Sequence, residues 1–148
     1  ARRSKSGRQM TEAQTRIHPE TGETLVRGMR PMTITYKGRC ATFDMPGWYA
    51  ETDAEGEHGL HDAKDTKASD RALNTLKARA NGLLEPTAIR SVRQKLRLSQ
   101  KQAGVLIGGG PNAFQKYEAG DVLISKSADT ALRLLANDPS RLNELAVR

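Results

Sequence analysis

The hydrophobic positions divide the chain into an early stretch of alternating character and a longer stretch with helical spacing. Between about residues 24 and 50, β-forming residues alternate in Thr33-Ile34-Thr35-Tyr36 and Cys40-Ala41-Thr42-Phe43, and Lys37-Gly38-Arg39 can form the turn between them. Pro46-Gly47 is a second turn signal. The pattern predicts a small antiparallel sheet, which needs packing against a helix, a metal or a partner to be stable.

The middle of the chain predicts an irregular segment followed by a helix. Residues 50–65 are acidic and have no periodic pattern, so we expect a loop there. A helix should begin near Ser69, a residue suited to the N-cap position. Leu84-Glu85-Pro86 then marks a domain boundary. The expected apolar stripe of this helix is Ala72, Leu73, Leu76, Ala80 and Leu83.

After Pro86 the spacing predicts five helices. Thr87 and Ser99 are the expected caps of the first two, Ser127 can start the fourth, and Asp138-Pro139-Ser140 introduces the fifth. The apolar positions that we expect to face inward are Ile89, Val92, Leu96, Ala128, Ala131, Leu132, Leu134, Leu135, Leu142, Leu145 and Val147.

These elements predict an α+β protein with a small antiparallel β domain joined to an all-α five-helix domain. We expect a disordered basic tail over 1–15, a partner-binding β-containing domain over 16–68, a connecting helix over 69–85, and a helical domain over 86–148. No run of 18 apolar residues is present, and the single cysteine, Cys40, permits no internal disulfide. We therefore expect a cytoplasmic protein without membrane attachment, associated with the nucleoid if it binds DNA.

The stretch IGGGPNAFQKYEAG at residues 107–120 is the most distinctive motif of the chain. Three glycines can end one helix and reverse the chain, Pro111 suits the first turn of the next helix, and Gly120 suits its end. A phosphate-binding loop would need Gly-Lys-Ser or Gly-Lys-Thr after the glycines and a strand before them. Because neither is present, a helix-turn-helix is the better interpretation.

Residues 98–120 resemble the Xre/Cro-type helix-turn-helix. Small residues at 103 and 104 let the two helices cross closely, and Ile107 and Phe114 can bury against each other across the turn. The positions that match the spacing of the motif are Leu98-Ser99-Gln100, Ala103-Gly104, Ile107, Gly108, Phe114, Glu118 and Gly120.

In such a motif the second helix enters the major groove with its N-terminal residues nearest the bases. Phe114 and Tyr117 are expected in the core, since they recur with Ile107 at helical spacing. The predicted base-contacting residues are Asn112, Lys116, Gln115 and Pro111, and the predicted phosphate-contacting residues are Gln100, Lys101 and Ser99. The alternatives are a capping role for Asn112 and a solvated charge for Lys116.

Charge is distributed unevenly around the overall net charge of +7. Residues 11–85 hold ten basic and twelve acidic side chains, whereas residues 86–148 hold ten basic and five acidic ones. This favours a polyanion as partner of the C-terminal part and a different partner for the middle. The acidic set Glu51, Asp53, Glu55, Glu57, Asp62 and Asp65 is either a solvated surface or a dock for a basic partner.

The run GGGPNAFQKYEAG and the later LLANDPSRLNEL resemble the C-terminal domain of MqsA-type antitoxins. Gly22-Glu23, the Tyr36–Arg39 hairpin and Trp48-Tyr49 fall in the order of the family's N-terminal half. The resemblance implies a dimeric repressor of its own operon that binds a palindromic double-stranded DNA operator and neutralises a small basic ribonuclease toxin. Family residues that contact bases, an Asn and an Arg, map onto Asn112 and Lys116, and Lys lacks the guanidinium fork.

The resemblance also implies a zinc held by two Cys-x-x-Cys pairs, which this chain cannot provide. The corresponding stretches are Ile17-His18-Pro19-Glu20 and Tyr49-Ala50-Glu51-Thr52-Asp53. We expect no metal and no cofactor, and we expect His18, His58 and His61 to be solvated or hydrogen-bonded. The small sheet must then be held by packing and polar contacts, or be completed by a partner.

The sequence therefore predicts an antitoxin-type transcriptional repressor that is a homodimer and not an enzyme. No arrangement of nucleophile and base can be argued from it. The alternative is a stand-alone, phage-like transcription regulator whose N-terminal domain senses a ligand or a protein.

Overall fold

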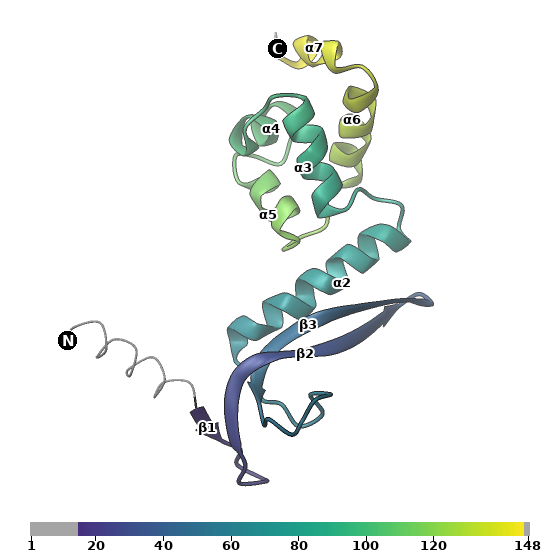
Figure 1. Ribbon diagram of the computed structural model, residues 1–148. Helices are drawn as coiled ribbons and strands as arrows, with labels where there is room; N and C mark the ends of the chain where they lie inside the picture. Colours follow the sequence, from purple (N-terminus) through teal and green to yellow (C-terminus); the bar gives the residue numbers. More distant parts are fainter. Residues whose placement is uncertain (1–14, 147–148) are drawn as a thin grey trace, which may run out of the picture. The chain divides into compact units, whose positions relative to one another are not determined.

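The computed structural model describes residues 15–146. The predicted basic tail, except for Thr15, and the predicted core residue Val147 lie outside these described residues. The fold is α+β, as predicted, with a three-stranded antiparallel sheet followed by helices (Figure 1). The described residues form two compact units. Unit 1 comprises residues 15–34 and 42–69, and unit 2 comprises residues 35–41 and 70–146.

The sheet has the strand order β1-β2-β3, with bounds β1 Thr15–Ile17, β2 Thr24–Tyr36 and β3 Arg39–Tyr49. Strand β1 pairs antiparallel with the start of β2, so that Thr15 faces Val26 and Ile17 faces Thr24. The predicted turn between β2 and β3 is confirmed at Lys37-Gly38, where both residues have positive φ. Such a two-residue turn matches the twist of the strands that it joins.

The predicted turn at Pro46-Gly47 is wrong, because both residues lie within β3. A Cβ atom on Gly47 would lie 2.7 Å from the His61 ring and 2.9 Å from the Leu60 carbonyl oxygen. Leu60 forms an isolated antiparallel bridge with the neighbouring Trp48. Gly47 thus allows the loop after β3 to approach the strand closely.

The helix predicted near Ser69 begins earlier. A 3₁₀ turn, η1 (Ala63–Asp65), precedes α2 (Thr66–Ala80). Asp62 and Asp65 form the capping box that starts this segment, and Ser69 lies inside the helix. The predicted start at Ser69 is therefore wrong by three residues.

Five helices follow, as predicted: α3 (Pro86–Lys95), α4 (Gln100–Ile107), α5 (Ala113–Ala119), α6 (Lys126–Asn137) and α7 (Leu142–Ala146), with η2 (Pro139–Arg141) before the last. Glu85 rather than Thr87 is the N-cap of α3, and Ser125 rather than Ser127 caps α6 by accepting from the Ala128 N–H. Pro111 lies in the turn before α5 rather than in its first turn. The Ser99 cap is confirmed, with Gln102 completing a capping box.

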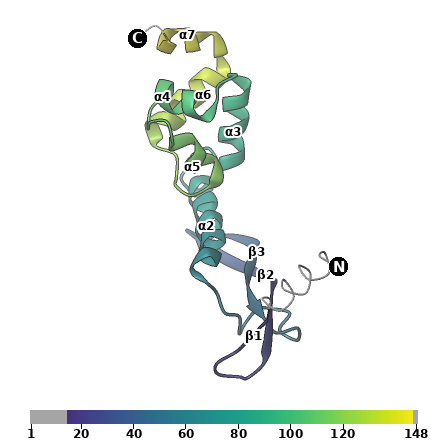
Figure 2. The same cartoon turned by 90° about the vertical axis from the view of Figure 1, so that its left-hand side faces the viewer.

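Helices α3 to α6 surround the core of unit 2 (Figures 1 and 2). The buried members of this core are Ile89, Leu96, Ala103, Phe114, Tyr117, Ile124, Ala128, Leu132 and Leu135. Leu134, which we expected to face inward, is 60% exposed. Ala128, Leu132 and Leu135 follow the i, i+4, i+7 spacing of one helix face, and Leu134 lies off that face.

Candidate nucleic-acid interface

The helix-turn-helix of unit 2 depends on a close approach between α4 and the glycine turn. Gly108, Gly109 and Gly110 all have positive φ, which glycine adopts without steric cost. The Gly110 N–H donates to the Gly104 carbonyl over 3.2 Å. Because a Cβ atom on Gly104 would collide with the Gly110 carbonyl, only glycine fits at position 104 without a backbone shift.

Helix α5 is anchored by its apolar side. Phe114 and Tyr117 are buried, as predicted, and their rings meet edge to face with centroids 5.5 Å apart. Gly120 ends the helix in the left-handed conformation.

The polar side of the same segment is exposed. The four predicted base-contacting residues, Pro111, Asn112, Gln115 and Lys116, are all exposed. Asn112 stands at the N-cap position, yet its side chain makes no capping hydrogen bond. The Asn112 amide is thus not used to close the helix end, and both its donor and its acceptor can meet a ligand.

A polar network that the sequence analysis did not anticipate fixes α5 against α3. Arg93 donates from Nε and Nη2 to the two carboxylate oxygens of Glu118, over 2.7 and 2.9 Å, and from Nη1 to the Leu98 carbonyl over 3.0 Å. The side chains are only 12% and 4% exposed. The hydrogen bond to Glu118 raises the pKa of Arg93. The only sequence signal was the motif position of Glu118, because its partner lies 25 residues away.

The three predicted phosphate-contacting residues have different surroundings at the start of α4. Gln100 donates from Nε2 to Glu118 over 3.2 Å, so its side chain belongs to the same network. Ser99 accepts from the Gln102 N–H over 3.0 Å. Lys101 is exposed. The structure thus gives Gln100 and Ser99 internal partners and leaves Lys101 extended toward solvent.

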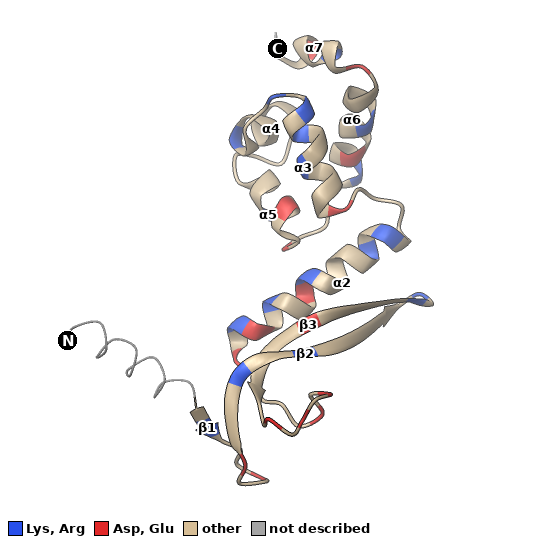
Figure 3. Ribbon diagram, viewed as in Figure 1, with Lys and Arg blue, Asp and Glu red and all other residues tan. Residues whose placement is uncertain are grey.

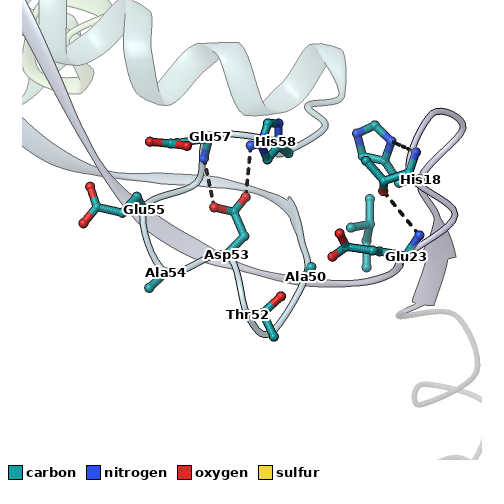
Figure 4. Close-up of a pocket in the computed structure, with 11 residues that line it drawn as sticks. His18, Glu23, Ala50, Thr52, Asp53, Ala54, Glu55, Glu57 and His58 are labelled. Carbon is teal, nitrogen blue, oxygen red and sulfur yellow. Dashed lines mark hydrogen bonds between the residues drawn. The ribbon is translucent and has the colours of Figure 1, made fainter.

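Unit 1 contains a second candidate site, a cavity of about 330 Å³ lined by His18, Glu23, Asp53, Glu55, Glu57 and His58 among others (Figure 4). His61 does not line this cavity. Its Nδ1 hydrogen-bonds with the Pro46 carbonyl, and its ring lies edge-on to Tyr49. Across residues 15–146, no group of three or more His, Cys, Asp or Glu side chains is placed to hold a metal ion.

Half of the predicted acidic set makes contacts within unit 1. Asp65 receives two hydrogen bonds from Arg27, over 3.0 and 2.8 Å, which lower the pKa of its carboxyl group from 3.8 to about 2. Asp62 accepts from Trp48 Nε1 over 3.1 Å and from Arg16 over 3.3 Å, and these bonds lower its pKa.

Asp53 accepts from backbone amides of its own loop, and the bond from the His58 N–H has the largest share in lowering its pKa. The remaining three acidic residues of the set, Glu51, Glu55 and Glu57, are exposed.

Comparison with known proteins places the chain in a family. The family model for the antitoxin component of bacterial toxin-antitoxin systems, MqsA, matches residues 19–146. Antitoxin MqsA of Escherichia coli K12 is 34% identical to this chain over 131 residues, an alignment that covers 82% of this chain and 92% of the relative. None of the helices described in residues 15–146 is long and apolar enough to cross a membrane. By the extent of both matches, this chain belongs to the MqsA family of antitoxins.

Proposed function

We propose that this antitoxin represses transcription by binding a palindromic operator as a homodimer, with one α5 helix in the major groove of each half-site. The observation that carries the proposal is the exposed Asn112 beside the turn, whose side chain makes no capping hydrogen bond. Lys116, also exposed, lies one turn further along α5. An Asn side chain can pair with both N6 and N7 of adenine, and Lys can donate to guanine or to a phosphate. Gln115 and Pro111 would flank these contacts.

The start of α4 would contact the DNA backbone. Lys101 supplies an exposed positive charge there, and the N-terminal backbone amides of α4 favour an anion. In this proposal Ser99 and Gln100 hold the start of α4 in position, through the capping box and the bond to Glu118, while the Gln100 backbone N–H faces the phosphates.

We assign dimerisation to the outer side of α6 and α7. A groove of about 180 Å³ there is lined by the apolar side chains of Ala131, Leu134, Leu135 and Leu145, together with Arg141 and Glu144. Leu134 is one of five large hydrophobic side chains with high exposure in the described part of the chain. An exposed leucine beside an apolar groove is typical of a surface that a second copy covers.

The N-terminal part, residues 16–68, would bind the toxin, with residues 69–85 connecting it to the DNA-binding and dimerising part, residues 86–148. The described residues of unit 1 hold five basic and nine acidic side chains. Acidic residues lie in the loop between β1 and β2 and in the loop after β3 (Figure 3). Glu23, Glu55 and Glu57 line the cavity, and Glu51 lines an adjoining hollow of about 390 Å³. Among the described residues these four carboxylates make no ion pair, so they suit the cationic surface of a ribonuclease.

The role proposed here is binding rather than catalysis, and family membership favours an antitoxin over a stand-alone regulator. The test is a fluorescence anisotropy titration with labelled DNA from upstream of the gene. Asn112→Ala should cost about 1–3 kcal/mol of specific binding, because one bidentate base contact is lost. Gln94→Ala, which removes an exposed amide from α3, is the matched control. Equal affinity of the Asn112 variant and the wild type would refute the base contact.

A further inference from the structure

The zinc that the family resemblance implies does not fit the donor atoms of unit 1. Cys40 is exposed and lies in the β2–β3 turn region, which belongs to unit 2. Where the two cysteine pairs are expected, the chain has His18 in the first stretch and Asp53 in the second. Both residues line the same cavity, and both use their side chains to hold backbone amides.

His18 closes the turn between β1 and β2. Its ring is buried, and Nδ1 accepts from the N–H groups of Glu20 and Thr21 over 3.1 and 3.3 Å. The His18 backbone adds two bonds of 2.9 Å, one to the Glu23 carbonyl and one from the Gly22 N–H. A ring nitrogen that accepts from two amides is not available as a metal ligand.

Asp53 closes the loop after β3 in the same way (Figure 4). Its Oδ1 accepts from the N–H groups of Gly56 and Glu57 over 2.9 and 3.0 Å, and its Oδ2 accepts from the His58 N–H over 3.0 Å. Both carboxylate oxygens are therefore engaged.

Arg30 joins this loop to β2. It donates from Nε to the Asp53 carbonyl over 2.6 Å and from Nη2 to the Ala50 carbonyl over 3.1 Å. Its guanidinium also lies 4.8 Å from the centre of the Tyr49 ring, which is buried. Side chains thus fix both the inside of the loop and its connection to the sheet.

A third set of contacts joins β1, β2 and the end of the loop around Trp48. The guanidinium groups of Arg16 and Arg27 lie 5.1 and 5.3 Å from the centre of the Trp48 ring. The same arginines pair with Asp62 and Asp65, and Asp62 also accepts from the indole N–H. Each strand of the sheet and the loop after β3 is thereby held by side chains of this chain.

We propose that unit 1 keeps its fold without metal, and that the side-chain acceptors of His18 and Asp53 fix the two turns that zinc-bound cysteines would otherwise fix. The consequence for function rests on the toxin-binding role proposed above. A partner-binding unit of this kind has no zinc thiolates to lose to a chelator or to an oxidant. Toxin release by removal of a structural zinc or by oxidation of zinc-bound thiols is then not open to this antitoxin.

The test uses the full-length protein expressed with zinc in the medium. Trp48 is the only tryptophan and lies in unit 1, so its fluorescence follows the unfolding of that unit. We expect well under one zinc per chain by mass spectrometry of the metal content. We also expect the same midpoint of thermal unfolding in EDTA, in added zinc and in dithiothreitol. One zinc per chain, or a midpoint that falls in EDTA, would overturn the proposal.

Variants test the assigned residues. Asp53→Ala should lower the midpoint of the Trp48 transition by roughly 5–15 °C, since three amides lose their acceptor. Asp44→Ala, an exposed position on β3, should leave it nearly unchanged. A variant whose Trp48 signal is already that of unfolded protein, with the helical circular dichroism retained, would also support the assignment. Equal midpoints for the two variants would contradict it. Neither DNA nor toxin takes part, so the result is independent of the proposed function.

Discussion

The two units of this antitoxin are held together by different physical means. Unit 2 buries a contiguous apolar cluster from α3 to α6 and caps two of its helices with serines, Ser99 and Ser125. Unit 1 buries fewer large apolar side chains, chiefly Leu25, Met45 and Tyr49, and depends on hydrogen-bonded turns and on the contacts around Trp48. The smaller unit thus relies on directional polar contacts, whereas the longer helical unit relies on apolar burial.

The buried pair of Arg93 and Glu118 departs from this contrast within unit 2, and it leads to the prediction with the largest effect. Arg93→Ala should lower the free energy of unfolding of unit 2 by about 3–5 kcal/mol, because it leaves the buried Glu118 carboxylate without its charged partner. Urea unfolding followed by far-ultraviolet circular dichroism measures this loss. Arg90→Ala, an exposed position on the same helix, is the control. If the two variants unfold alike, the buried pair does not stabilise the unit.

Acid should weaken unit 1 through Asp65. The pKa of this carboxyl group lies near 2 in the folded chain, below its ordinary value of 3.8, so folding favours the ionised form. The stabilisation is complete above pH 3.8 and is lost as the pH falls toward 2. We expect a loss of about 2 kcal/mol from this group, measured by urea unfolding with Trp48 fluorescence between pH 5 and pH 2.

Asp65→Asn separates this group from the other carboxyls of unit 1. The variant cannot titrate at position 65, so its stability should be lower at pH 5 and should change less toward pH 2. An equally steep fall of stability in wild type and variant would assign the acid sensitivity to other groups.

The smallest expected effect concerns ordinary helix capping in unit 2. Ser99→Ala removes the acceptor of the Gln102 N–H and should cost about 1 kcal/mol of stability. Ser127→Ala, an exposed position inside α6, should change stability little. Urea unfolding resolves the difference, and a Ser99 variant as stable as the Ser127 variant would show that the cap contributes nothing measurable.

Local signals in the sequence were sufficient for most of unit 2. The glycine turn, the Ser99 cap, and the buried Phe114 and Tyr117 each depend on residues within one or two helical turns. The same kind of signal misplaced the starts of α2 and α6, where two candidate caps lie within a few residues and packing selects one. The outward position of Leu134 could not be predicted, because it depends on which face of α6 turns toward the neighbouring helices.

Contacts between distant residues could not be predicted in the same way. Arg93 meets Glu118 across 25 residues, and Arg27 meets Asp65 across 38, so no pattern along the chain joins them. Gly47 has the composition of a turn but is needed within β3, because the loop after that strand passes against it. The need for glycine at position 47 comes from Leu60 and His61, which lie 13 and 14 residues further along the chain.

The central claim is that Asn112 contacts a base of the operator, and a double-mutant cycle tests it most directly. Footprinting first defines the operator, and each A·T pair within a half-site is then replaced in turn. Binding of wild-type protein and Asn112→Ala is measured for each DNA. The account predicts one pair whose replacement weakens the wild type by about 1–3 kcal/mol and the variant hardly at all. Replacement costs that are equal for both proteins at every position would contradict it.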